Sequence, residues 1–422
     1  MSRQRVLVFA PGIIPSDKPV QYYLPEHPKI KEGARLAPVA LIKLQETLCD
    51  KRRPDRVIAL CTEKVKTDRL PSIKEEFREL GIDVDDLDIP DGRNAEQIRE
   101  IVRVLLQSVP NECDLVLDVT HGFRSVQIVF SVAAQYLSLL RPGVHIEGLY
   151  YGMMGDMKKD PPDAAPLINL DLFIELMNWA YAVRVYRDTH LPQKLADMLG
   201  GTEDPSGQTA AMEGSLSRFS DALDLGLPIE MAERAVGLNS LLAEPMPPVL
   251  AEKALLPDEL FGLVGGFASQ FAPESGDAVP DELDESEIRR QANIIDRFLE
   301  VGRTAHAIGM MREWVVLMVT YYNGDRSLWR TKKQRRDAEK MIWKAGDRQL
   351  WTSPEIGDAV KAIWEFRNTL HHHGHESGNP LDTDGVLLEA RQAWDCLKSA
   401  IGQEAEWRIA PQIADGQQEA EQ

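Results

Sequence analysis

The sequence predicts an α/β domain with a mostly parallel sheet, followed by an all-α region. Up to about residue 160, short apolar runs alternate with stretches of helical periodicity. Such alternation is typical of parallel strands whose connecting helices cover both faces of the sheet. After the pair of prolines at 161–162 only helical periodicity continues, and we find no internal repeat. The 422 residues suffice for two or three domains with cores of their own.

The first domain is predicted to be Rossmann-like and to cover residues 1–160. Ligands in such sheets bind at the carboxyl ends of the strands. The glycine-rich dinucleotide fingerprint does not follow the first strand, which argues against NAD or FAD. The predicted strands are 5–10, 56–61, 84–89, 114–119 and 145–151, and the helices between them are 38–49, 73–80, 95–107 and 126–140. Four strand ends then line one crevice, with Pro11 and Gly12, Thr62 to Lys64, Thr120 to Gly122, and Tyr150 to Gly152.

The remainder is predicted to be helical in two parts. Residues 161–287 form a helical connecting region that opens with a helix at 170–187 and ends in an acidic, flexible linker at 272–287. Residues 288–408 form a second helical domain, and 409–422 a disordered tail. Within the second domain a helix is predicted to start at Ser353, because Ser353-Pro-Glu supplies an N-cap, a proline at the first position and an acid in the first turn.

The net charge of −19 disfavours indiscriminate binding to nucleic acids. Residues 312–350 are nevertheless a local basic segment, with Trp329 and Trp343 among the cations. A solvated helix face is the usual explanation of such a segment. The tryptophans favour a surface for single-stranded polynucleotide instead, because bases stack on aromatic rings.

The cysteines are scattered and lack the spacing of a zinc site or disulfide framework, as expected for a cytoplasmic protein. The longest apolar stretch, 126–140, is too short and too polar to span a bilayer. The segment before the first strand lacks a signal-peptide cleavage site. We therefore expect no membrane association.

The polar run from Asp118 to Ser125 is the first candidate site. It follows an apolar strand and precedes an apolar helix, with Gly122 in its middle. A turn of this kind presents free backbone N–H groups at a helix start, where anions bind. A phosphorylated ligand is expected here. Asp118, at the end of the strand, is expected to support the turn rather than contact the ligand.

The second candidate site is the segment from Phe366 to His375, at the end of the helix that starts at Ser353. Arg367 continues the apolar stripe of that helix, so it is expected to face another helix, which could come from a second subunit. The histidines after it admit three interpretations. They could bind a metal, although no carboxylate or cysteine completes the set. They could complement the helix dipole. They could also manage the proton of an RNA 2′-hydroxyl, while Arg367 steadies the charged phosphorane.

Helix geometry leaves the choice of histidine open. His371 lies four residues after Arg367 and shares its face, whereas His372 lies about 140° around the axis. His372 shares a face with Asn368 instead. Two copies of the helix packed together could still bring Arg367 and His372 to one cleft.

Both sites resemble motifs of one protein family. The run Asp118-Val-Thr-His-Gly resembles the D-x-T-H-G signature of CRISPR-associated proteins with a CARF sensor domain, a Rossmann-like fold. The run Arg367-Asn-Thr-Leu-His-His resembles the R-N-x-x-x-H motif of HEPN ribonucleases, which would select His372 over His371. Further stretches at 89–94, 149–152 and 307–314 resemble family patterns. The resemblance covers most of the chain and is least secure at 200–287.

The resemblance implies a function. Cyclic oligoadenylate, made by a type III CRISPR complex, would bind the CARF dimer, and the HEPN dimer would then cut single-stranded RNA without a metal ion. Catalysis would rest on Arg367, Asn368 and His372. The activator would be contacted by the residues Pro11, Gly12, Thr62, Glu63, Thr120, His121, Gly122, Arg124, Ser125 and Tyr151. The alternative is a ligand-sensing protein whose helical half only dimerises or recruits a partner, and whose CARF domain could degrade the activator.

Overall fold

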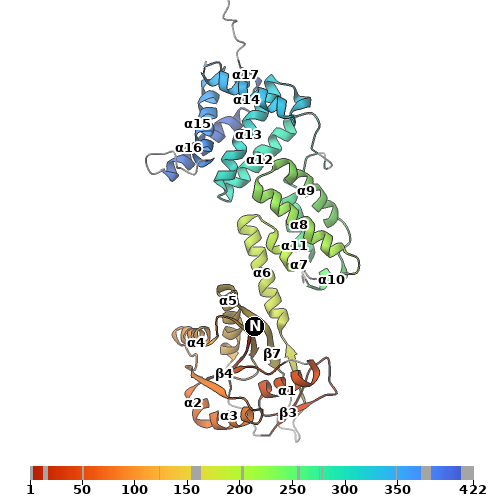
Figure 1. The fold of residues 1–422 in the computed structure, drawn as a ribbon, viewed down its shortest axis with the longest axis vertical. Coiled ribbons are helices and arrows are strands. Elements are labelled where there is room, and N and C mark those ends of the chain that lie inside the picture. The colour runs from red at the N-terminus through yellow and green to blue at the C-terminus, as the bar shows by residue number, and fades with distance from the viewer. Residues whose placement is uncertain are drawn as a thin grey trace, which may run out of the picture. The chain divides into compact units, whose positions relative to one another are not determined.

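The computed structural model describes residues 3–12, 18–49, 52–122, 124–153, 163–200, 204–253, 257–274, 276, 279–347, 349–371 and 382–409. They form two compact units, Met1–Asn178 and Trp179–Gln422, drawn in Figure 1. Each unit is described by itself. No helix in these described ranges is long and apolar enough to cross a membrane.

The first unit is built on an eight-stranded sheet with the order β3-β2-β8-β7-β6-β1-β4-β5. Every pairing is parallel except β2 with β3 and β7 with β8. The mostly parallel α/β architecture predicted from the sequence is confirmed. The strands are β1 (Gln4–Phe9), β2 (Val20–Tyr23), β3 (Glu32–Ala34), β4 (Arg56–Cys61), β5 (Val84–Asp88), β6 (Cys113–Asp118), β7 (Val144–Gly152) and β8 (Ala165–Asn169).

Helices cover both faces of this sheet because its strands are apolar on both sides. In β1, Leu7 and Phe9 belong to one buried cluster, whereas Val6 and Val8 belong to the other. The first cluster includes side chains of α1 (Ala37–Cys49), α2 (Glu63–Asp68) and α3 (Leu70–Arg78). The second includes side chains of α4 (Ala95–Ser108) and α5 (Arg124–Leu140). A sheet buried on both faces is expected from continuous apolar runs.

The connection order creates a switch point between β1 and β6. After β1 the chain forms β2 and β3 at one end of the sheet, then adds β4 and β5 on one side of β1, and returns through β6 and β7 on the other side. The helices that next follow β1 and β6, α1 and α5, pack on opposite faces of the sheet. Ligands of open α/β sheets bind in the crevice at such a point.

Three strands, β2, β3 and β8, differ from the sequence expectation. The strand signal was expected to end near residue 160, but β8 follows at Ala165–Asn169 and pairs with both β7 and β2. These strands have only three to five residues, too few for a clear alternation pattern. They extend the sheet beyond β7, so β7 is an inner strand rather than an edge.

The second unit is built of helices, as predicted, apart from an isolated antiparallel β-bridge between Trp351 and Ile409 among its described residues. The helix α6 (Asp171–Thr189) begins in the first unit and ends in the second. Then follow α7 (Gln193–Leu199), α8 (Gln208–Leu225), α9 (Pro228–Leu242), α10 (Pro248–Lys253), α11 (Pro257–Ala268), α12 (Glu285–Glu300), α13 (Thr304–Asn323), α14 (Lys332–Asp347), α15 (Pro354–His371), α16 (Thr383–Ser399) and α17 (Glu404–Trp407). The predicted cap is present at the start of α15, where the Ser353 hydroxyl accepts the N–H of Ile356 at 3.4 Å.

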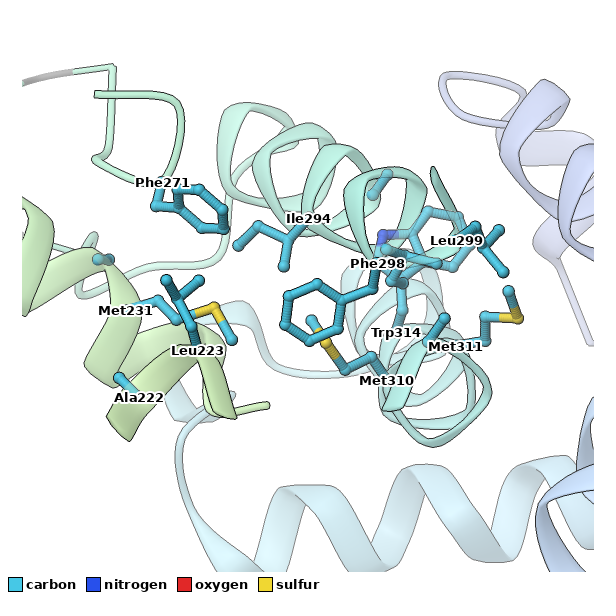
Figure 2. Close-up of a cluster of buried hydrophobic side chains, with 14 of the residues drawn as sticks. Ala222, Leu223, Met231, Phe271, Ile294, Phe298, Leu299, Met310, Met311 and Trp314 are labelled. Carbon is cyan, nitrogen blue, oxygen red and sulfur yellow. The ribbon is translucent and has the colours of Figure 1, made fainter. Parts of the chain in front are cut away.

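One buried core joins the helices of this unit. Figure 2 shows Leu223 and Met231, from α8 and α9, beside Phe298 of α12 and Met310 of α13. Trp314 of α13 lies in the same core and donates its indole N–H to the carbonyl of Ile288 at 2.9 Å. Side chains from the predicted segments 161–287 and 288–408 thus share a core.

The acidic segment 272–287, suggested as a flexible linker, is packed in its second half. Val279 and Leu283 are buried in the helical core. The N–H of Leu283 donates to the carbonyl of Arg326 at 3.1 Å. Asp284 caps α12 by accepting the N–H of Glu287 at 2.8 Å. Apolar side chains spaced among the acids anchor this part of the segment despite its charge.

Candidate functional site

The turn after β6 is held by a buried carboxylate. Asp118 is 1% exposed, and its two oxygens accept the N–H of Thr120 at 3.1 Å and the Thr120 hydroxyl at 3.0 Å. The same hydroxyl oxygen accepts the N–H of Gly152 at 2.7 Å. Thr120 thereby joins the ends of β6 and β7. Burial raises the pKa of Asp118 to about 7, against the lowering effect of the two bonds from Thr120. Asp118 supports the turn, as the sequence suggested.

The loops after β1 and β6 touch through their backbones. A Cβ atom at Gly12 would overlap the backbone nitrogen of Gly122 and lie 2.9 Å from its Cα. Gly122 has φ = +97°, a backbone conformation that residues other than glycine rarely adopt. The contact lies at the switch point between β1 and β6. Because both residues are glycines, the surface of the turn at this contact consists of backbone atoms.

Replacing Gly12 with alanine is expected to weaken ligand binding at this turn. The new methyl group meets main-chain atoms, which cannot rotate away, so one loop must shift. We expect the affinity of this turn for a phosphorylated ligand, tested with the cyclic oligoadenylate that the family resemblance implies, to fall by about tenfold in isothermal titration calorimetry, which corresponds to about 1.4 kcal/mol of binding free energy. Gly266→Ala, on the helix α11, is a matched control, since nothing lies within 4 Å of a Cβ atom there and its backbone is helical. Equal losses in both variants would contradict a specific role for the contact.

His121, predicted to contact phosphate, is buried against the start of α1. Its ring is buried, and its Nε2 accepts the N–H of Ala37, the first residue of α1, at 3.3 Å. Burial lowers the pKa of His121 to about 4, so the ring is neutral at neutral pH. A neutral ring bonded to a helix start stabilises the turn against α1. The sequence showed the residue type but not its burial.

The other predicted ligand contacts differ in their accessibility. Thr62 caps α2 through its hydroxyl, which accepts the N–H of Val65 at 3.5 Å, and Glu63 beside it is exposed. Tyr151 is 38% exposed, whereas Tyr150 is buried and its hydroxyl accepts an N–H of Gln45 at 3.0 Å. Tyr151 is therefore the tyrosine available to a ligand. Pro11 is buried. Arg124 and Ser125 are the first residues of α5, and the side chains of these two residues lie outside the described part of the structure.

Gln127 was missed by the sequence analysis. Both polar atoms of its amide are buried, and neither has a hydrogen-bond partner among the described residues. Its Nε2 would lie 3.0 Å from a Cβ atom at Gly122, so it borders the same turn. An unpaired buried amide is costly and is a natural partner for a polar ligand group. The only signal in the sequence was a glutamine interrupting the apolar run of α5.

The second candidate site is the last part of α15. Ile356, Val360 and Ile363 are buried along the predicted stripe, and Arg367 continues it in a half-buried position. The Arg367 guanidinium donates to the side-chain oxygen of Asn368 at 3.4 Å, a weak bond in an exposed setting. The helix is described as far as His371. His372, the histidine favoured by the family motif, lies outside the described residues.

A charge network borders this helix. Arg312 of α13 pairs with Glu313 at 2.5 Å and with Glu339 of α14 at 2.8 Å, and its guanidinium lies 4.9 Å from the ring centre of Trp364 on α15. Arg335 pairs with the same two carboxylates at 2.9 and 3.2 Å. The two arginines bonded to it hold the pKa of Glu313 below its usual value despite burial. Two cations of the predicted basic segment, Arg312 and Arg335, are thus paired with carboxylates of the protein itself.

The two tryptophans of the basic segment have different environments. Trp329 is buried and donates its indole N–H to the carbonyl of Asp281 at 3.1 Å, so it cannot stack on a base as expected. Trp343 is 58% exposed. Within the described ranges, no group of three histidine, cysteine, aspartate or glutamate side chains could hold a metal ion.

Comparisons with known proteins connect the chain to CRISPR systems. No protein-family model matches the chain. Over 198 residues, 46% of the chain, it is 24% identical to the CRISPR-associated protein MJ1674 of Methanocaldococcus jannaschii, and the match spans 28% of that protein's length. The structure of Enterococcus italicus Csm6 bound to cyclic hexa-2′-fluoro-hexa-dAMP aligns over 96% of this chain and 94% of its own, at 10% identity and a TM-score of 0.38. Nearly half of this chain is thus similar in sequence to a CRISPR-associated protein.

Proposed function

We propose that this protein is an endoribonuclease of type III CRISPR defence that is switched on by cyclic oligoadenylate. The observation that carries the proposal is the presence in one chain of two separate sites. One is a glycine-lined turn at the switch point of the sheet, and the other is the Arg367–Asn368 pair near the end of α15. The sequence similarity to a CRISPR-associated protein supports the same assignment.

The turn suits a phosphorylated activator for three reasons. The Gly12–Gly122 contact exposes backbone there, and α5 begins at Arg124, at the kind of helix start whose N–H groups bind anions. The buried amide of Gln127 offers a polar partner beside the turn. Tyr151 offers an exposed ring on which adenine can stack. Of the predicted contacts, Gly12, Gly122, Arg124, Ser125 and Tyr151 remain in the proposed site, together with Gln127.

At the second site the proposed reaction is transesterification by the RNA itself. The 2′-oxygen attacks the adjacent phosphorus, the bond to the 5′-oxygen breaks, and a 2′,3′-cyclic phosphate and a 5′-hydroxyl are formed. Arg367 supplies a fixed positive charge for the phosphorane, and Asn368 accepts a weak hydrogen bond from its guanidinium. His372 would take the proton of the 2′-hydroxyl or return one to the leaving oxygen. No atom changes its oxidation state in this reaction, so the step needs no redox cofactor.

We further propose that the protein acts as a homodimer through α5. Residues 125–140 carry no charged side chain, although the chain as a whole has a net charge of −19. Ile128, Val132, Tyr136 and Leu139 form one stripe of this helix, which we call the α5 stripe, and are 46–67% exposed. An uncharged surface lets two acidic chains meet without local charge repulsion. A two-fold pairing there would bring two copies of the turn into one assembly, as a cyclic ligand requires.

A single charge in the α5 stripe should separate the dimer. We expect Val132→Glu to raise the dimer dissociation constant by more than roughly a hundredfold, because each copy would bury an unpaired, like charge. Sedimentation velocity across a concentration series measures this. Gln107→Glu adds the same charge at an exposed position of α4 and should leave the association unchanged. A Val132→Glu protein that still sediments as a dimer would show that the copies meet elsewhere.

The activity is tested by incubating a fluorescent single-stranded RNA with the purified protein in EDTA. Cyclic tri-, tetra- and hexaadenylate are each added in separate reactions. We expect cleavage with one of these rings and little without. Cleavage that EDTA abolishes would exclude the proposed metal-free mechanism. A dimer that binds a ring but never cuts RNA would instead favour a sensor that recruits a partner, and linear oligoadenylate products would show degradation of the activator.

A further inference from the structure

A pocket of about 800 Å³ lies along the groove between α14 and α15. Its described lining includes three tryptophans, Trp343, Trp351 and Trp364, and it reaches Asn368. None of the proposed catalytic steps uses this pocket. A volume of this size is typical of sites for small organic groups. The question is which group it takes.

The aromatic walls are fixed in place. Trp351 lies against the backbone of α15 at Gly357, where an added Cβ would come within 3.0 Å of the indole ring. Trp364 is covered on one side by Arg312, which is itself held by Glu339. Trp343 stands at the rim and remains 58% exposed. A large exposed indole beside two positioned ones is a stacking surface prepared for a flat ring.

The charges around the pocket favour a base over a phosphate. Two carboxylates of α15, Asp358 and Glu365, line it, and between them Lys361 lies 3.9 Å from Glu365. Carboxylates repel phosphate but accept hydrogen bonds from exocyclic amino groups. The exposed Lys340 and Lys344 flank Trp343 on α14 and could contact the phosphates of a strand whose base enters the pocket. Lys340 is loosely paired, at 3.6 Å from Asp337.

We propose that this pocket binds one nucleobase of the RNA substrate and prefers bases with an amino group, adenine, cytosine or guanine, over uracil. Trp343 provides the stacking face, and Asp358 and Glu365 accept from the amino group. Asn368 lines the pocket and also accepts from Arg367, so the bound nucleotide lies beside the proposed cleavage group. The inference rests on the proposed nuclease function and adds to it a specificity-determining subsite.

Binding is measured apart from cleavage. The full-length Arg367→Ala protein is titrated with fluorescein-labelled 2′-O-methyl oligomers of A, C and U of equal length, which cannot be cut, and fluorescence anisotropy gives the affinities. We expect the A and C oligomers to bind more tightly than U. Adding Trp343→Ala should weaken binding of every oligomer by roughly tenfold, as the loss of one base-stacking contact predicts. Trp343→Phe keeps a ring and should retain most of the affinity.

The pair of substitutions Asp358→Asn and Glu365→Gln tests the selectivity. An amide both donates and accepts hydrogen bonds, so it can bond to the carbonyl oxygen of uracil as well as to the amino group of cytosine. The preference for the C oligomer over the U oligomer should therefore shrink to less than about twofold. Unchanged affinities on Trp343→Ala would overturn the proposal, as would an equal affinity of the unsubstituted pocket for all three oligomers. A Trp343→Ala protein that loses self-association instead of RNA binding would make the groove a contact between copies. If the wild-type protein never cuts RNA while these binding differences hold, the nuclease proposal fails and the base pocket stands.

Discussion

Replacing Arg367 with alanine is expected to lower the rate of activated RNA cleavage by about 10²- to 10³-fold, the usual loss when one fixed charge that stabilises a transition state is removed. The guanidinium is half-buried on α15 and donates to the side-chain oxygen of Asn368. The substitution should lower the cleavage rate at saturating RNA more than it raises the RNA concentration that gives half of that rate. Single-turnover cleavage with activator in excess separates the two.

Two further variants make this result specific. Arg367→Lys keeps the charge but loses the planar fork, so it should recover only part of the rate. Arg289→Ala removes an exposed arginine that is paired with Glu285 on α12 and should cut RNA like the wild type. Binding of the activator should be unchanged in all three proteins. Normal cleavage by Arg367→Ala would exclude α15 as the catalytic helix.

The stability of the sheet should respond to pH in opposite directions when either of two buried groups is removed. Asp118 has a folded-state pKa of about 7, above its ordinary value of 3.8, so its contribution to stability falls as the pH rises from about 4 to about 7. His121 has a folded-state pKa of about 4, below its ordinary 6.5, so its contribution rises over nearly the same range. In the wild type the two trends offset each other.

Asp118→Asn should therefore leave a sheet whose stability rises between pH 4 and 6.5. His121→Gln should leave one whose stability falls between pH 4 and 7. Each change in the free energy of unfolding is on the order of 4 kcal/mol, from about 1.4 kcal/mol per unit of pKa difference. Hydrogen exchange of β6 amides measures it. All eight tryptophans lie at position 179 or later, so their fluorescence reports the second unit and serves as the internal control. Parallel pH profiles in both variants would contradict the burial of these groups.

Much of the fold could be predicted from the sequence because its main strands are continuous apolar runs. β1 and β6 are buried on both faces, and such runs stand out without knowledge of their partners. β2 and β8 could not be predicted in the same way. They are short, and β8 pairs with β2, more than a hundred residues away, as well as with its neighbour β7. Local pattern holds no information about such a pairing.

The candidate sites were predictable in position but not in detail. Residue types placed a turn after β6 and a cation near the end of α15. Whether a polar side chain faces the solvent or the core depends on tertiary packing, which turned His121 and Trp329 inward. The same packing gave importance to two residues that the sequence left unremarked, Gln127 beside the turn and Trp364 beneath Arg312. Gly12 was chosen for its place at a strand end, and only the structure shows which backbone it touches.

The network of Arg312, Glu313, Arg335 and Glu339 also bears on how ionic strength affects RNA binding. Two arginines of the basic segment have already exchanged their counterions for carboxylates of the protein. They release no further ions when a polyanion arrives. The dependence of affinity on salt then counts the exposed lysines and arginines of α14 outside this network rather than the full charge of the segment. Each phosphate neutralised on a single strand contributes about −0.7 to the slope of log K against log salt. A basic run in a sequence thus overstates the number of charges that a bound nucleic acid can use.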